Sequence, residues 1–120
     1  MKFFQIVRVS ITAAISVATT ASMANAESLA GKVGDKRFPV GVMGTLGGCQ
    51  KTYNKYIAAA GHSAYAQTLL GRTDEFFICG SHLNAKSQQA AEAQALKNCE
   101  EARKYYKVKV TGACSIAASK

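Results

Sequence analysis

The residues best suited to chemistry are four cysteines and two histidines. Cys79 precedes His82 by three residues, and a thiol beside an imidazole is the pair that cysteine nucleophiles use. His62 is a second candidate, because it falls in a predicted glycine turn. Neither the Cys-x₂₋₄-Cys nor the His-x₃₋₅-His spacing of structural zinc sites occurs. The sequence therefore predicts no catalytic residue, no metal ligand and no cofactor.

The cysteines are instead predicted to form two disulfides. Their number is even, and the amino-terminal segment indicates export, a context in which thiols are oxidised. Four cysteines allow three pairings. We favour Cys99–Cys114, because a strand returning along a helix would bring these residues together, and Cys49–Cys79 by elimination. In the chain-entropy model each bridge contributes about 3 kcal/mol, which is substantial for a small domain.

Residues 1–26 have the features of a cleavable export signal. Lys2 and Arg8 form a basic start, and residues 9–21 carry no charge. The small residues of Ala24-Asn-Ala26 are typical of a cleavage site, so we place the cut after Ala26. The uncharged core is shorter than the roughly 20 residues of a transmembrane helix, so no stable membrane anchor is expected. The segment is bacterial in style, and we expect a periplasmic or secreted protein.

The chain that remains after cleavage is basic. Residues 27–120 keep 13 of the 15 Lys and Arg and all seven acidic residues, which gives a formal charge of +6. Such a charge favours an anionic envelope polymer or an acidic protein as partner, although a solvated basic surface without a specific partner is an equal alternative. Export and the lack of a clustered arginine–aromatic pattern argue against nucleic acid.

Tyrosine supplies the candidate binding surface. The chain has five tyrosines and no tryptophan. A tyrosine suits a protein or sugar surface, but it is more often found at the edge of a core. If a surface binds a partner, we place it where tyrosines alternate with lysines, at Lys51, Tyr53, Lys55, Tyr56, His62 and Tyr65.

The first half of the mature chain has weak patterns. Residues 27–48 contain six glycines and the only proline, and predict a flexible arm with an edge strand at 38–43 as an option. Two segments around a glycine turn, Tyr53–Ala60 and Ala64–Leu69, read as a hairpin, with a helix over 51–60 as the alternative. A short aromatic strand is predicted at 75–80 and a polar loop at 81–86.

The clearest element is a helix at Ser87–Tyr105. The Ser87 hydroxyl can accept a hydrogen bond from an amide of the first turn. An apolar stripe follows at helical spacing, with Leu96 beside it, and consists of Ala91, Ala95, Cys99, Ala102 and Tyr106. Residues 107–111 alternate Lys and Val and predict a half-exposed strand, and Cys114–Ser119 predicts the last strand.

Three motifs, Phe77-Ile-Cys-Gly, Ala95-Leu-Lys-Asn-Cys99 and Cys114-Ser-Ile, together resemble a small exported domain common among proteobacterial proteins of unknown function. In that domain a strand precedes an "Ala-Leu-x-x-Cys" helix and a "Cys-x-Ile/Val" strand. The similarity covers about residues 56–120. It implies a small antiparallel sheet on one helix and a bridge between the helix cysteine and the last-strand cysteine, with no established activity.

Taken together, the patterns predict an α+β domain over residues 49–120. We expect three or four antiparallel strands packed on one long helix and held by disulfides. The function that we expect is that of an exported basic binding or interaction module, without catalytic activity, that acts on an envelope component or a host protein. The alternative is a small secreted enzyme or enzyme inhibitor that uses the His62 turn or the Cys79–His82 loop.

Overall fold

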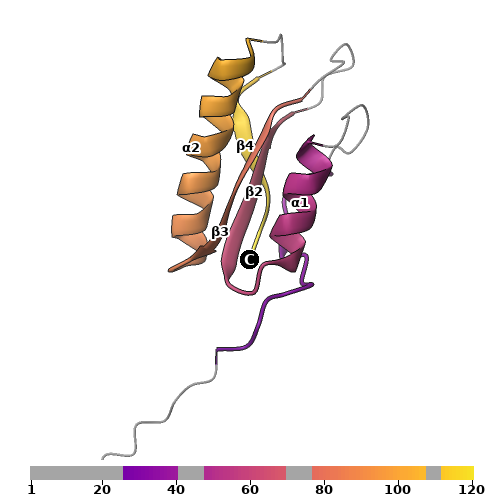
Figure 1. Ribbon diagram of the computed structural model, residues 1–120, viewed down its shortest axis with the longest axis vertical. Coiled ribbons are helices and arrows are strands. Elements are labelled where there is room, and N and C mark those ends of the chain that lie inside the picture. Colours follow the sequence, from indigo (N-terminus) through magenta and orange to yellow (C-terminus); the bar gives the residue numbers. More distant parts are fainter. Residues whose placement is uncertain (1–25, 41–47, 70–76, 108–111) are drawn as a thin grey trace, which may run out of the picture.

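The computed structural model describes residues 26–40, 48–69, 77–107 and 112–120 (Figure 1). Nearly all of the predicted export signal therefore lies outside the described residues. In chain order the elements are β1 (Asp35–Lys36), α1 (Gly48–Ala58), β2 (His62–Thr68), β3 (Cys79–Ala85), α2 (Gln88–Tyr106) and β4 (Cys114–Ser119). Among these elements, neither helix is long and apolar enough to cross a membrane. The predicted α+β class, with one long helix, is confirmed.

The four strands form one antiparallel sheet in the order β1-β4-β2-β3. Strands β3 and β4 both run antiparallel to the central β2, so they are parallel to each other, and α2 connects them. The two helices cover opposite faces of this sheet (Figure 1). The result is three layers, one more than the sequence predicted, because the second helix was not foreseen.

Helix α2 packs closely on the sheet because small residues line both surfaces. Its Ala91, Ala95 and Cys99 are fully buried against a cluster that includes Ala64 and Ala66 of β2. The edge strand β3 contributes a glycine at the contact: a Cβ on Gly80 would lie only 2.4 Å from the Cys99 backbone nitrogen. The helix and the sheet are therefore in backbone-to-backbone contact at this point.

The predicted start and inner face of α2 are confirmed, but its last turn is not buried. Ser87 is the N-cap, and its Oγ accepts a hydrogen bond from the Ala90 amide at 3.1 Å. Tyr106, expected on the apolar stripe, is 61% exposed. The stripe keeps its contact with the core as far as Ala102, which packs on the α2-side cluster, and Glu100 accepts a hydrogen bond from the Cys114 amide at 2.8 Å, so only the end of the helix beyond Ala102 is turned to solvent.

The predicted strand at Tyr53–Ala60 is wrong, because these residues belong mostly to helix α1. Cys49, Tyr53 and Tyr56 follow one another at spacings of four and three, and this stripe faces the sheet. Packing of this stripe against the sheet thus stabilises a helix, which was the alternative prediction for residues 51–60. The second half of the predicted hairpin is confirmed as β2, displaced by about two residues.

The next strand also lies later than predicted. Cys79–Ala85 forms β3, which includes most of the predicted polar loop at 81–86, whereas residues 75–76 lie outside the described part. Because β3 is at the edge of the sheet and half-exposed, it accommodates polar side chains that suggest a loop. Residues 108–111 of the strand predicted at 107–111 are likewise not described.

The segment expected to be a flexible arm is bound to the domain over residues 27–40. Its strand β1 pairs with β4, and it is not at the predicted position 38–43, where residues 41–43 are outside the described range. The Leu29 amide donates to the Ala60 carbonyl at 2.9 Å, and the Gly31 amide to the Ile57 carbonyl at 2.7 Å. Hydrogen bonds to carbonyls at the end of α1 therefore hold the segment that its glycine content predicted to be flexible.

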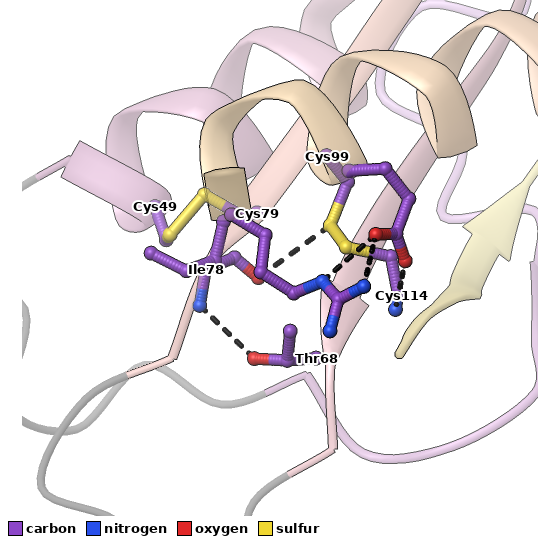
Figure 2. Close-up of a disulfide and its surroundings, with 8 residues drawn as sticks. Cys49, Thr68, Ile78, Cys79, Cys99 and Cys114 are labelled. Carbon is purple, nitrogen blue, oxygen red and sulfur yellow. Dashed lines mark hydrogen bonds and ion pairs between the residues drawn. A yellow bond between two sulfur atoms is a disulfide. The ribbon is translucent and has the colours of Figure 1, made fainter. Parts of the chain in front are cut away.

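Both predicted disulfides are present (Figure 2). Cys49–Cys79 joins the start of α1 to the start of β3, and Cys99–Cys114 joins α2 to the start of β4. The Sγ of Cys99 is also in van der Waals contact with the Ile78 carbonyl oxygen, at 3.8 Å. Each helix is thus covalently attached to the sheet near the same end of the molecule, as expected for a chain that folds in an oxidising environment.

Candidate functional site

Helix α1 is the element that carries most of the predicted binding residues, and it is held at several points. Its first turn is fixed by the Cys49–Cys79 bridge. Farther along, the Tyr56 hydroxyl donates to the Val33 carbonyl at 2.5 Å. Tyr53 packs against both neighbouring tyrosines, with ring centroids 5.7 Å from Tyr56 and 5.2 Å from Tyr65. These contacts fix the rotation of the helix, so its outward residues are defined.

We define the α1 face as the exposed residues Lys51, Asn54, Lys55 and Ala58. Gln50 donates a hydrogen bond to Asn54 at 2.8 Å along its border. No acidic residue occurs within α1. The ion pairs seen among the described residues are elsewhere and join Lys32 to Glu27, Arg37 to Glu92 and Arg103 to Glu100. The two lysines therefore give the α1 face a positive charge that neighbouring side chains of the helix do not neutralise.

The six predicted binding residues do not form one surface. Lys51, Lys55 and His62 are exposed, and Tyr53 is partly buried. Tyr56 and Tyr65 are fully buried between α1 and the sheet, so their prediction as contact residues is wrong. Of the two roles considered for the tyrosines, a binding surface and the edge of a core, these two tyrosines have the core role.

Burial leaves two polar atoms on the α1 side of β2 without a hydrogen bond. In the described part of the chain, neither the Tyr65 hydroxyl nor Gln67 Oε1 has a partner. Burial raises the pKa of Tyr65, with a smaller contribution from Tyr53. It likewise raises the pKa of Tyr56, where Tyr53 and Asp35 add to the effect. Both phenols are consequently neutral at any physiological pH.

A residue that the sequence did not point to, Lys120, completes this region. Its side chain is buried, and its ammonium group lies 5.1 Å from the centroid of the Tyr56 ring. The Nζ donates to carbonyl oxygens at distances of 2.8 to 3.3 Å, and those acceptors belong to Leu29, Lys32, Ile57 and Ala59. Desolvation lowers the pKa of Lys120. From the sequence alone, this lysine would be expected to be exposed to solvent. Only its contacts in the structure show that it joins the amino-terminal segment to the end of α1.

The alternative site at Cys79 and His82 is not assembled. Cys79 is oxidised in a disulfide, so it has no thiol to act as a nucleophile. The two residues are also three apart on β3 and face opposite sides of the sheet. Cys79 packs with the α1-side cluster, whereas His82 is paired in register with Ala64 of the α2-side cluster. The remaining candidate, His62, is an exposed residue at the start of β2.

Side chains that could bind a metal do not cluster in the part of the chain that the structure describes: no group of three or more His, Cys, Asp or Glu is placed to hold an ion.

Comparison with known proteins gives no relative either. The chain matches no family model, and no curated protein or solved structure is significantly similar to it. The function is therefore inferred from the surfaces of this molecule.

Proposed function

We propose that this protein is a small exported binding module, released into the periplasm or beyond by cleavage after Ala26. Its α1 face would bind an anionic envelope polymer or, alternatively, an acidic protein, without catalysing a reaction. The observation that supports this proposal best is the pair of exposed lysines, Lys51 and Lys55, on a helix that has no acidic residue.

The spacing of the two lysines suits a ligand with repeated negative groups. Residues four apart on a helix are neighbours, with Cβ atoms about 6 Å apart. A polymer with acidic groups at a similar repeat can therefore contact both ammonium groups at once. Because both side chains are exposed, salt would screen each contact, and binding should weaken as ionic strength rises.

The rigid attachment of α1 supports the same reading. A helix fixed by a disulfide, a tyrosine hydrogen bond and tyrosine ring contacts presents its lysines in one orientation. Binding then requires little ordering of the protein beyond the lysine side chains, and this lowers its entropic cost. The two disulfides are consistent with an oxidising location, where envelope polymers would be met.

The test compares two double variants that lose the same charge. Lys51→Gln with Lys55→Gln alters the α1 face, and Lys86→Gln with Lys97→Gln removes two exposed lysines elsewhere. Each protein is incubated with envelope extract and with a purified acidic polysaccharide at low and high salt. We expect the α1 variant to lose binding about tenfold or more and the control variant to retain it. Equal losses in both variants, or the absence of a salt-sensitive partner, would refute the proposal.

A further inference from the structure

The far end of α2 presents two tyrosines to solvent. Tyr105 is 77% exposed and Tyr106 is 61% exposed. Their ring centroids are 5.0 Å apart, and the ring planes meet at 88°. In the described part of the chain these are the most exposed large apolar side chains. In the part of the chain that the structure describes, neither ring belongs to the two core clusters or packs against them.

Lysines flank this pair on both sides in the chain. Lys104 and Lys107 are exposed, and Lys107 ends the helix with a left-handed backbone, φ 49°. Arg103 is paired with the Glu100 carboxylate at 2.6 Å, so these two charges cancel locally. Glu101 is the exposed acidic residue of the same turn. We define the α2 end as Lys104, Tyr105, Tyr106 and Lys107, a surface of two rings and two positive charges.

We propose that the α2 end docks reversibly on the surface of an anionic phospholipid bilayer. Tyrosine rings are amphipathic and concentrate at the level of lipid head groups, where the ring is apolar and the hydroxyl stays hydrated. The two lysines would lie beside the lipid phosphates, and each lysine near an anionic membrane contributes favourably. Charge complementarity and ring chemistry thus point to the same occupant.

The shape of the α2 end favours a membrane over a folded protein. A stable protein interface buries about 800 Å² on each partner and is built around side chains that fill pockets. The α2 end has four exposed residues at a helix terminus, whereas a bilayer interface needs only a few exposed amphipathic side chains. Contact through two rings and two lysines would hold the protein weakly and reversibly, without insertion of a helix.

This inference concerns a surface different from the α1 face and does not depend on it. The test uses the protein in its exported form with both disulfides intact, and measures co-sedimentation with vesicles of phosphatidylglycerol or of phosphatidylcholine. One double variant changes Tyr105→Ser and Tyr106→Ser. A second changes Lys104→Gln and Lys107→Asn, because asparagine tolerates the left-handed backbone of that cap. The Lys86→Gln/Lys97→Gln protein is the charge-matched control.

The wild-type protein should sediment with the anionic vesicles at low salt and much less with the neutral ones. We expect the tyrosine variant to lose about tenfold in affinity, the α2-end lysine variant about thirtyfold, and the control little. All variants should keep the wild-type melting temperature, since the altered side chains are exposed. Three results would overturn the proposal: no binding of the wild type to the anionic vesicles, equal binding to the neutral vesicles, or full binding by the tyrosine variant. The Lys51→Gln/Lys55→Gln protein should bind the vesicles like the wild type. Failure of the α1 proposal would appear only in the assay with envelope extract and polysaccharide, so the two proposals can fail separately.

Discussion

Tyr65 and Tyr56 allow a matched test of how the α1 side of the core is stabilised. Both rings are fully buried, but only the Tyr56 hydroxyl has a hydrogen bond, to the Val33 carbonyl. A buried polar group without a partner costs about 1–3 kcal/mol, whereas the loss of a partly buried hydrogen bond, whose acceptor water can reach, costs about 1 kcal/mol. The same chemical change, Tyr→Phe, should therefore have opposite effects at the two positions.

For Tyr65→Phe we expect the free energy of unfolding to rise by about 1 kcal/mol or more, which corresponds to a melting temperature about 4–8 °C higher for a domain of this size. For Tyr56→Phe we expect a fall of about 1 kcal/mol, because the partly buried hydrogen bond to the Val33 carbonyl is lost. Urea unfolding with both disulfides intact gives the two values. The rings stay in place in both variants, so the difference reports the hydroxyl groups.

Alkaline pH provides an independent check with a defined sign. Burial raises the pKa of Tyr65 above its ordinary value of 10.0, so above pH 10 the unfolded chain releases this proton and the folded protein keeps it. The stabilisation is complete below pH 10 and is lost as the pH rises toward the folded-state pKa. Tyr65→Phe should remove one tyrosine from this loss, up to about 1.4 kcal/mol per pH unit. Lys120 acts in the opposite direction, because its lowered pKa makes the unfolded chain bind more protons, but it contributes equally to both proteins.

One result would contradict the reasoning directly. If Tyr65→Phe destabilised the protein as much as Tyr56→Phe, the Tyr65 hydroxyl would have a strong partner, and the α1 side of the core would be arranged differently. An identical alkaline profile for Tyr65→Phe and the wild type would have the same meaning, since it would show that this phenol ionises as freely in the folded protein as in the unfolded chain.

Other changes probe the remaining contacts. Gly80→Ala should lower the free energy of unfolding by about 3 kcal/mol, because its new Cβ would overlap the α2 backbone at Cys99, whereas Gly48→Ala, which meets no atom within 4 Å, should be nearly neutral in the same melting experiment. Lys120→Met should lower the free energy of unfolding, measured in urea, by about 2–4 kcal/mol, because the carbonyl oxygens that Nζ contacts lose their donor. An unchanged urea midpoint would mean that water already solvates these oxygens. Reduction of both disulfides, which span separations of 30 and 15 residues, should remove about 6–7 kcal/mol, and calorimetry should then show no cooperative transition.

The sequence predicted the elements whose patterns are local. Helix α2 has both a serine cap and a regular stripe of alanines, and each can be read without knowledge of the fold. The disulfide pairing followed from the order of helix and strand near Cys99 and Cys114. Strand β2 was found because its residues follow a glycine turn and alternate small and large side chains.

The elements that depend on distant partners were predicted less well. Helix α1 is fixed by Tyr53 and Tyr56 packing on the sheet. The three alanines at its end favoured a helix, but the glycine turn and the alternating segment that follow them suggested a hairpin. A cysteine–tyrosine–tyrosine spacing of four and three was present and would have indicated a helix. The role of Lys120 had no local pattern at all, because its carbonyl partners come from two segments roughly 60 to 90 residues earlier.

The candidate surface was predicted in part. Lys51 and Lys55 were named from composition, and the structure places both on the exposed side of α1. Tyr105 and Tyr106 were not proposed as a surface, because the periodicity of α2 assigned the second of them to the core. Periodicity alone cannot show at which residue of the stripe burial ends, so the exposure of Tyr106 could be recognised only in the structure.

The first cysteine of this protein is joined to the second and the third to the fourth, so the two covalent loops are consecutive and do not interlock. For a polypeptide oxidised as it emerges amino end first, Cys49 meets its native partner before either of the other thiols appears. The same holds for Cys99, because Cys79 is by then already consumed. Oxidation in order of emergence would therefore yield the native linkage directly, without a wrong bond that thiol–disulfide exchange has to correct.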